Sequence, residues 1–159
     1  MKKIESRVVE QVGKRRQELV NLCQKLVQAK GENPPGDVHE AAGVVERFLA
    51  EEGISYERFE PQRGHVSVVG RAGKGKPSLI MCGHIDVVPA GDASKWASHP
   101  YSGDLRNGRI LGRGASDMKG GVAAMLMALA AVKDFEADLA GSVTVASVCD
   151  EEAQGPGGA

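Results

Sequence analysis

The sequence predicts an α/β protein, in which helices pack on a layered sheet. Two observations lead to this class. In the first fifty residues apolar side chains recur at helical spacing, whereas from residue 54 the spacing shortens towards two. Further on, the apolar run at 122–132 (VAAMLMALAAV) separates two shorter apolar runs, SLIMCG at 78–83 and VTVASVC at 143–149. Strand, crossover helix and strand in this order would make the two strands parallel.

The N-terminal part is expected to form two helices. The first spans residues 4–29, and the loop at 30–36 ends it with two prolines and a glycine. The second begins at Asp37, an N-cap residue with Glu40 three positions on, as in a capping box. Gly53 is well placed to close this helix in the left-handed conformation.

The remaining elements follow from changes in periodicity. Strands are expected at 54–59, 65–70, 78–83 and 143–149, and a helix packed under the sheet at 122–132. Residues 87–104 form a long polar loop. The segment 105–111 brackets Asn107-Gly108, the strongest short signal for a hairpin turn.

Bulk properties exclude several classes of partner. The chain has 159 residues, which suits one domain, and a formal net charge of -1, which argues against a nucleic-acid or anionic-membrane surface. Aromatic residues make up only 4%, too few for a base-stacking platform. We expect no signal peptide, no apolar stretch long enough to span a bilayer, and buried free thiols at Cys23, Cys82 and Cys149. The expected location is the cytoplasm.

Metal-binding side chains follow both of the buried strands that flank the crossover. His84 and Asp86 come directly after one strand, and Glu151 and Glu152 follow the other. Parallel strands would bring both groups to the same edge of the sheet, where Asp117, at the mouth of the apolar helix, can join them. Asp86, two residues from His84 in an extended segment, could hold the imidazole by its second nitrogen. Asp117 could bridge a metal pair, while one glutamate ligates and the other moves protons.

Each piece taken alone has a simpler explanation. A His-x-Asp pair is usually a loop histidine with a solvated partner, and a pair of glutamates is usually exposed surface. An aspartate before an apolar helix is usually an N-cap. The segment 70–77 nearly matches a phosphate-binding loop, but Pro77 stands where a hydroxyl is needed and a strand follows, so we expect a turn. The joint occurrence of three metal-binding groups favours a metal-dependent hydrolase.

These residues resemble a known family. The motifs are GHIDVVP at 83–89, GRGASDMKGG at 112–121 and Asp150-Glu151-Glu152, with Trp96 and Pro100-Tyr101 between them. They are similar to those of the dinuclear-zinc family that includes acetylornithine deacetylase, succinyl-diaminopimelate desuccinylase, aminoacylase and glutamate carboxypeptidase. The resemblance implies a three-layer, zinc-exopeptidase-like catalytic domain with a mostly parallel central sheet. It also implies a cis peptide bond after Asp117.

The resemblance assigns a role to each candidate residue. His84 would bind the first metal ion, Glu152 the second, and Asp117 would bridge the two. Glu151 would be the general base that takes a proton from the attacking water, and Asp86 would orient His84. The two divalent ions would be zinc, with cobalt as an alternative. The implied reaction is hydrolysis of the amide bond of a small N-acyl amino acid or short peptide.

The family pattern also implies further sequence. An aspartate, a histidine and a dimerisation domain would follow, so residues 1–159 are expected to be the truncated N-terminal part of the catalytic domain. Each metal ion would then lack one ligand, and this chain alone is expected to be inactive. The full-length parent would be a homodimer. The alternative is a non-catalytic module that retains the motif and binds a metal or a partner.

Overall fold

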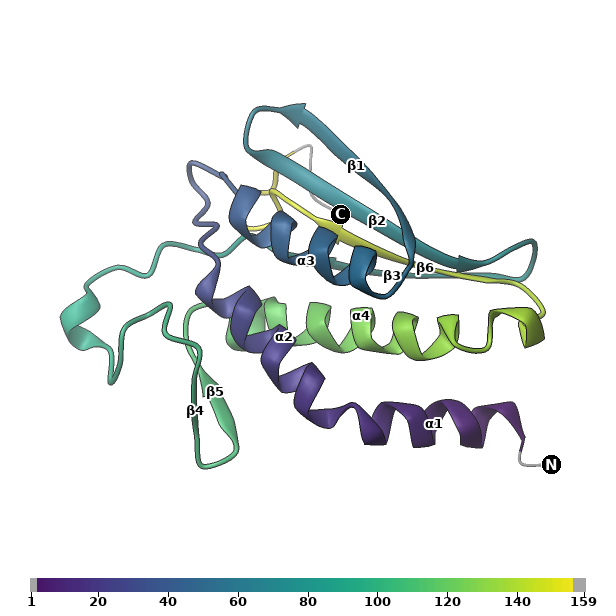
Figure 1. The fold of residues 1–159 in the computed structure, drawn as a ribbon. Coiled ribbons are helices and arrows are strands. Elements are labelled where there is room, and N and C mark those ends of the chain that lie inside the picture. Colours follow the sequence, from purple (N-terminus) through teal and green to yellow (C-terminus); the bar gives the residue numbers. More distant parts are fainter. Residues whose placement is uncertain (1–2, 156–159) are drawn as a thin grey trace.

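A four-stranded sheet forms the centre of the computed structural model, which describes residues 3–155 (Figure 1). The strands lie in the order β1 (Ser55–Gln62), β2 (His65–Gly73), β6 (Ser142–Val148) and β3 (Ser78–His84). The α/β class is confirmed. The expectation of a mostly parallel sheet is corrected, because β1–β2 and β2–β6 are antiparallel and β3–β6 is the parallel pair. Short connections after β1 allow antiparallel pairing, whereas the crossover between β3 and β6 makes that pair parallel.

The long N-terminal helix predicted at 4–29 is two helices, α1 (Ile4–Lys14) and α2 (Arg16–Gln28). They meet at Arg15, whose backbone leaves helical geometry. The Arg15 guanidinium, largely withdrawn from solvent, binds Glu52 at the end of the third helix as well as Glu18. This ion pair between distant segments fixes the bend, and periodicity alone does not reveal it.

The third helix, α3 (His39–Glu51), starts slightly later than expected. Val38 occupies the N-cap position, and no side chain caps the helix there. The Asp37 carboxylate still accepts a hydrogen bond from the backbone N–H of His39, at 3.1 Å. Glu40 accepts instead from the N–H of Lys30, so the capping box is not formed. Gly53 has a φ of 63°, which confirms the left-handed end.

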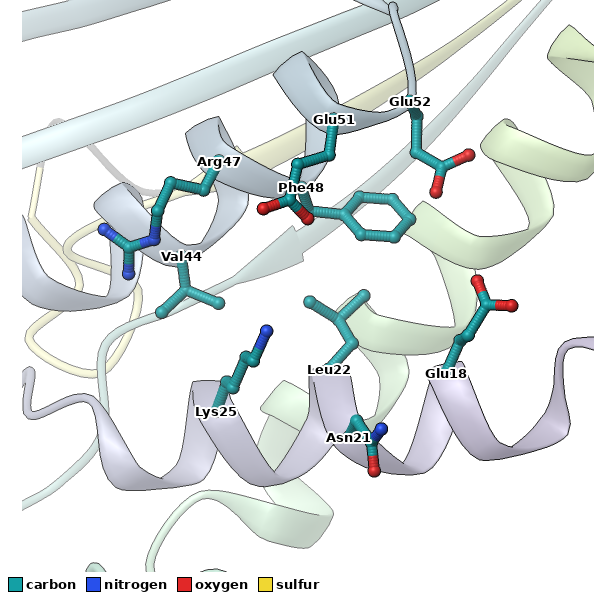
Figure 2. A pocket seen from close by; sticks show the side chains of 9 residues that line it. All are labelled: Glu18, Asn21, Leu22, Lys25, Val44, Arg47, Phe48, Glu51 and Glu52. Carbon is teal, nitrogen blue, oxygen red and sulfur yellow. The ribbon is translucent and has the colours of Figure 1, made fainter.

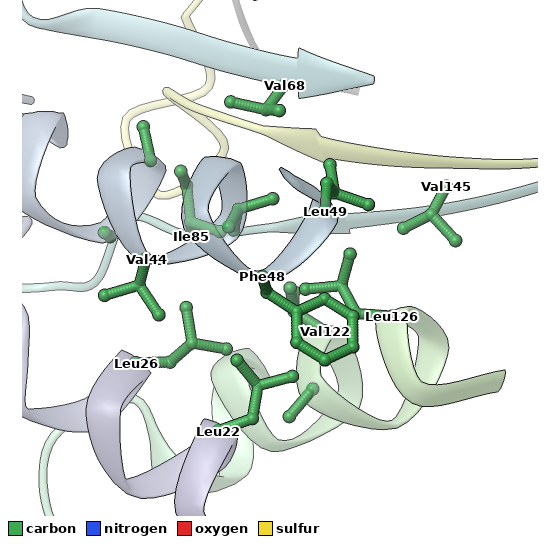
Figure 3. Packing of buried hydrophobic residues seen from close by; sticks show 14 of the residues in the cluster. Leu22, Leu26, Val44, Phe48, Leu49, Val68, Ile85, Val122, Leu126 and Val145 are labelled. Atoms are coloured by element: carbon green, nitrogen blue, oxygen red, sulfur yellow. The ribbon is translucent and has the colours of Figure 1, made fainter. Parts of the chain in front are cut away.

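The fourth helix, α4 (Gly120–Lys133), lies with α3 on one face of the sheet. A Cβ added at Gly70 in β2 would lie 2.7 Å from Leu49 of α3 and 3.4 Å from Leu129 of α4, so both helices approach the same face closely. Figure 3 shows Leu49 and Leu126 packed between the helices and the sheet. The opposite face carries Ile80, 66% exposed, and Cys82, which is exposed and not buried as expected, whereas Cys23 and Cys149 are buried. Within the described residues the helices therefore stack on one side, with α2 beyond α3 and α4.

One segment around α4 has the length and composition of a membrane span. Ala115–Lys133 is long and apolar enough to cross a bilayer, contrary to the sequence-based expectation. In the structure, α4 buries seven of its residues, including Leu126 and Leu129, and packs against three strands. Core packing against the sheet therefore accounts for its apolar composition.

The turns lie where the sequence predicts them. The hairpin β4 (Asp104–Arg106) and β5 (Arg109–Leu111) turns at Asn107 and Gly108, whose φ angles are 51° and 74°. Residues 74–77 join β2 to β3 without a helix, as expected for a turn. Short helical turns at Ala93–Lys95 and Glu136–Asp138 complete the fold.

Candidate metal centre

The parallel pair β3–β6 brings the two acidic segments to one edge of the sheet. His84, the last residue of β3, pairs with Val148 near the end of β6. The backbone N–H of Ile85 donates to the carbonyl of Val148, at 2.9 Å, so the strands stay in register to their ends. The residues after each strand therefore leave the sheet side by side, as the sequence predicts.

Three of the predicted residues meet there. His84, Asp117 and Glu152 each offer a ligand atom, and these atoms lie within 4.8 Å of one another. The Nε2 atom of His84 is 3.1 Å from an Oδ atom of Asp117. His84 is buried and the Asp117 side chain is largely exposed, so the cluster opens to solvent on the Asp117 side. One imidazole and two carboxylates are donors that zinc and related divalent ions accept, so these residues fit a metal ion.

The turn Ala115–Lys119 delivers Asp117 to the cluster. Gly114 precedes it with a φ of 78°, and the peptide bond Asp117–Met118 is cis, as the resemblance implied. A Cβ at Gly114 would lie 2.4 Å from a methyl of Val87, so only glycine allows the turn to approach the segment after β3 this closely.

Asp86 contacts His84 through two groups. Its backbone carbonyl lies 3.0 Å from Nδ1 of His84, and its carboxylate lies 3.5 Å from the same nitrogen. Asp86 is completely buried, and its carboxylate also accepts hydrogen bonds from the backbone N–H groups of Glu151 and Glu152, at 3.3 and 3.1 Å. It therefore contacts both segments that form the site.

Glu151 lies beside the cluster of three. Its carboxylate is 3.7 Å from Nε2 of His84, and the side chain is about half exposed. A carboxylate at the edge of the site with access to solvent is free to exchange protons with water. The geometry is compatible with a proton-transfer role for Glu151 and a ligand role for Glu152.

The electrostatics of the site favour a positive charge. The carboxylate of Asp86, its carbonyl and Asp117 together raise the pKa of His84 to about 9, against the opposing effect of burial. Burial and the neighbouring carboxylates of Asp117 and Asp86 raise the pKa of Glu152. Protonation of these groups relieves the negative charge that a bound cation would otherwise neutralise.

The structure adds residues that had no predicted role. Asn33 donates hydrogen bonds to Asp86 and Asp150, and Lys119 is buried with its ammonium 2.7 Å from the carbonyl of Ala29. Asp150 belongs to one of the recognised motifs and Asn33 to the loop at 30–36, but nothing in their spacing indicates a contact across 117 positions. The side chain of His65, at the start of β2, is only 12% exposed and lies 3.5 Å from Asp150.

A pocket between α2 and α3 lies away from this cluster. Figure 2 shows it between α2 and α3, with Leu22 and Phe48 at its base and charged residues such as Glu18 and Glu52 around it. None of its lining residues belongs to the metal cluster. The metal centre is therefore an open site at the sheet edge within the described residues.

Comparisons with known proteins agree with this geometry. Residues 80–159 match the description "Peptidase family M20/M25/M40". The chain is 43% identical over 86 residues to a succinyl-diaminopimelate desuccinylase of Rhodospirillum centenum, covering 54% of this chain and 22% of that protein. It is 33% identical over 147 residues to an N-formyl-4-amino-5-aminomethyl-2-methylpyrimidine deformylase of Bacillus subtilis, covering 89% of this chain and 34% of that protein.

The fold is also similar to solved structures. An M20 family metallo-carboxypeptidase of Sulfolobus solfataricus matches with a TM-score of 0.70 and 27% identity, over 82% of this chain and 30% of that one. The chain spans no more than about a third of the length of these relatives.

Proposed function

The chain belongs to peptidase family M20/M25/M40, and from this premise we propose that it supplies the metal-binding half of an amide hydrolase. The proposed reaction is metal-dependent hydrolysis of the amide bond of an N-acyl amino acid or short peptide. The observation that carries this proposal is the convergence of His84, Asp117 and Glu152, from three separate segments, within 4.8 Å.

Each residue has a proposed task in this reaction. His84 and Asp117 would hold one divalent ion, and Asp117 and Glu152 a second, with zinc the proposed metal and cobalt the alternative. When bound, the ions polarise the scissile carbonyl and acidify water. Glu151 takes the proton of the attacking water and passes it to the leaving nitrogen. Asp86 keeps the imidazole of His84 oriented.

The proposed substrate class is small and acylated. The names of two relatives describe removal of a succinyl and a formyl group from nitrogen. The exposed side of the cluster, next to Asp117 and Glu151, gives a small substrate access to the ligands. We propose an N-acyl amino acid or short peptide, with the acyl group undetermined, a cytoplasmic location and a homodimeric full-length parent.

We also propose that residues 1–159 alone bind metal weakly and turn over little substrate. Catalytic zinc normally has three protein ligands. The described residues bring three ligands to the cluster, and two ions that share Asp117 would each have two of them. Each ion therefore lacks one protein ligand within the part of the chain that the structure describes.

Metal binding tests the site directly. The purified chain is titrated with zinc against a chromophoric chelator, and Glu152→Gln and Glu151→Gln are compared with it. Glu152→Gln is expected to lose most of the affinity, because it removes a ligand, whereas Glu151→Gln is expected to retain metal. Glu57→Gln, on the exposed strand β1, is the matched control. Equal loss in the two site variants would contradict the division of roles.

Turnover tests the reaction. N-succinyl, N-acetyl and N-formyl amino acids are incubated with the zinc-loaded chain, and release of the free amine is measured. Little or no turnover is expected from residues 1–159. Zinc-dependent rates typical of enzymes would support amide hydrolysis and overturn the proposed inactivity. Absence of specific zinc binding in the wild-type chain would refute the metal site itself.

A further inference from the structure

Asn33 lies beneath the metal cluster, although it belongs to the loop between α2 and α3. It is 4% exposed. Its backbone N–H donates to the carbonyl of Val87, at 2.8 Å, and the N–H of Val87 donates to the carbonyl of Gly31, at 2.9 Å. The loop is thus bound along the segment that follows β3 and contains Asp86. Backbone hydrogen bonds therefore hold Asn33 next to this segment, in addition to any side-chain packing.

One amide nitrogen of Asn33 contacts two carboxylates. Nδ2 lies 2.9 Å from Oδ2 of Asp86 and 3.0 Å from Oδ1 of Asp150. An ionised carboxylate only accepts hydrogen bonds, so both N–H groups of the amide are used. The opposite orientation would point the amide oxygen at two acceptors, and this chemistry fixes which way the amide faces.

The two carboxylates belong to different strands. Asp86 follows β3, and Asp150 follows β6. Asp150 is buried as well, with a left-handed backbone at a φ of 69°. Aspartate is among the residues enriched in that conformation, and the bond from Asn33 supplies a partner for its side chain. Asn33 therefore connects the ends of the two strands that supply the ligands.

Asp86 extends this connection to the ligands themselves. Its carboxylate accepts hydrogen bonds from Asn33 and from the backbone N–H groups of Glu151 and Glu152, and it lies 3.5 Å from Nδ1 of His84. The carboxylate thus contacts the ring of His84 and the backbone of Glu152 at once. A change in the position of this carboxylate therefore acts on its contacts with both ligand-bearing segments.

We propose that Asn33 is a positioning residue of the metal site, which holds Asp86 and Asp150 together and thereby sets the separation of His84 and Glu152. This inference rests on the proposed metal centre. Residues that orient metal ligands typically change metal affinity by about 10–100-fold when removed. We therefore expect Asn33→Ala to weaken zinc binding about tenfold or more, although Asn33 offers no ligand to the ion.

Three variants separate positioning from packing. Asn33→Ala removes both donors. Asn33→Asp keeps the shape but directs a third carboxylate at Asp86 and Asp150, so its zinc affinity is expected to be at or below that of Asn33→Ala. In the double variant with Asn33→Asp and Asp150→Asn, called the exchange variant, position 150 donates and position 33 accepts. Asp86 is then left without the donor that Asn33 supplies. We expect the exchange to recover stability but not zinc affinity.

Two readouts are measured on each variant. The first is the zinc dissociation constant from chelator competition. The second is the amide proton shift and hydrogen exchange of Glu151 and Glu152 in the metal-free chain, which report the bonds to Asp86. Val45→Ala, a fully buried site in α3, is the control for general destabilisation. It is expected to lower the unfolding midpoint while leaving both readouts unchanged.

The outcomes are distinct. Weaker zinc binding and altered Glu151 and Glu152 amides in Asn33→Ala, with neither change in Val45→Ala, support the proposal. Wild-type affinity in Asn33→Ala, or full recovery of affinity in the exchange variant, overturns it. If Asn33→Ala does not fold, the exchange variant decides the question. If even the wild-type chain binds no zinc, the proposed function fails, and the amide signals of the metal-free chain still decide whether Asn33 holds Asp86.

Discussion

Lys119 offers a test of what it costs to keep a charged side chain in the interior near the site. Its side chain is fully buried, and its ammonium donates to the carbonyl of Ala29, at 2.7 Å. Burial lowers its pKa from 10.5 to about 8, although Asp86 and Glu40 act in the opposite direction. This lowering of the pKa from 10.5 to about 8 corresponds to a cost of about 3 kcal/mol for keeping the ammonium charged in the folded chain. Lys119→Met keeps most of the side-chain volume and removes this cost.

The sign of the pH dependence follows from the two pKa values. Between about pH 8 and 10.5 the unfolded chain binds more protons at Lys119 than the folded chain does, so rising pH stabilises the wild type. The variant gains nothing from this group. At pH 7 Lys119→Met gains stability because the cost of the buried charge is removed, but it loses the hydrogen bond to Ala29, which is worth roughly 1–3 kcal/mol. The variant should therefore be equal to the wild type in stability or up to about 2 kcal/mol more stable. By pH 10.5 its relative stability should have fallen by about 3 kcal/mol.

Urea unfolding with EDTA present, followed by circular dichroism from pH 7 to 10.5, measures this difference. Subtracting the two curves isolates Lys119 from the other titratable groups, because those groups are the same in both chains. Lys14→Met, at an exposed position of α1, is the control and should preserve the pH dependence of the wild type. A difference between wild type and Lys119→Met that stays constant across this range would refute the reasoning.

Three further predictions concern His84, two glycines and the core. Because the pKa of His84 is raised from 6.5 to about 9, the metal-free chain should lose up to about 3 kcal/mol of stability as pH rises through that interval, seen as a falling urea midpoint. Zinc must displace this proton, so its affinity should rise from pH 7 to 9 with measurable proton release in calorimetry. Gly114→Ala should destabilise the chain by at least about 2 kcal/mol in thermal melting, because its Cβ would lie 2.4 Å from Val87. Gly53→Ala has a similar φ but open space around the new Cβ, so it should cost only about 1 kcal/mol. Leu126→Ala should cost about 2–5 kcal/mol, and a loss below about 1 kcal/mol would show that the α4–sheet core is loosely packed.

The elements with local signals were predictable. The hairpin at Asn107-Gly108, the left-handed end at Gly53 and the apolar helix α4 depend on neighbouring residues, and each is found as expected. The break at Arg15 was missed because the apolar periodicity continues across it, and the pairing of Arg15 with Glu52, far along the chain, leaves no local signal. The strand directions were also wrong for β1 and β2, since pairing depends on connections that periodicity does not describe.

The sequence by itself determined which residues can bind a metal. His84, Asp117 and Glu152 stand after strands and before a helix, so their chemistry and their common sheet edge followed from order along the chain. Only the tertiary structure decided how they are held. Asn33 reaches Asp86 and Asp150 because the loop after α2 is bound along the segment that follows β3. Contacts of this kind join groups that are distant in sequence, so they exist only once the sheet has formed. Burial then makes their hydrogen bonds costly to break.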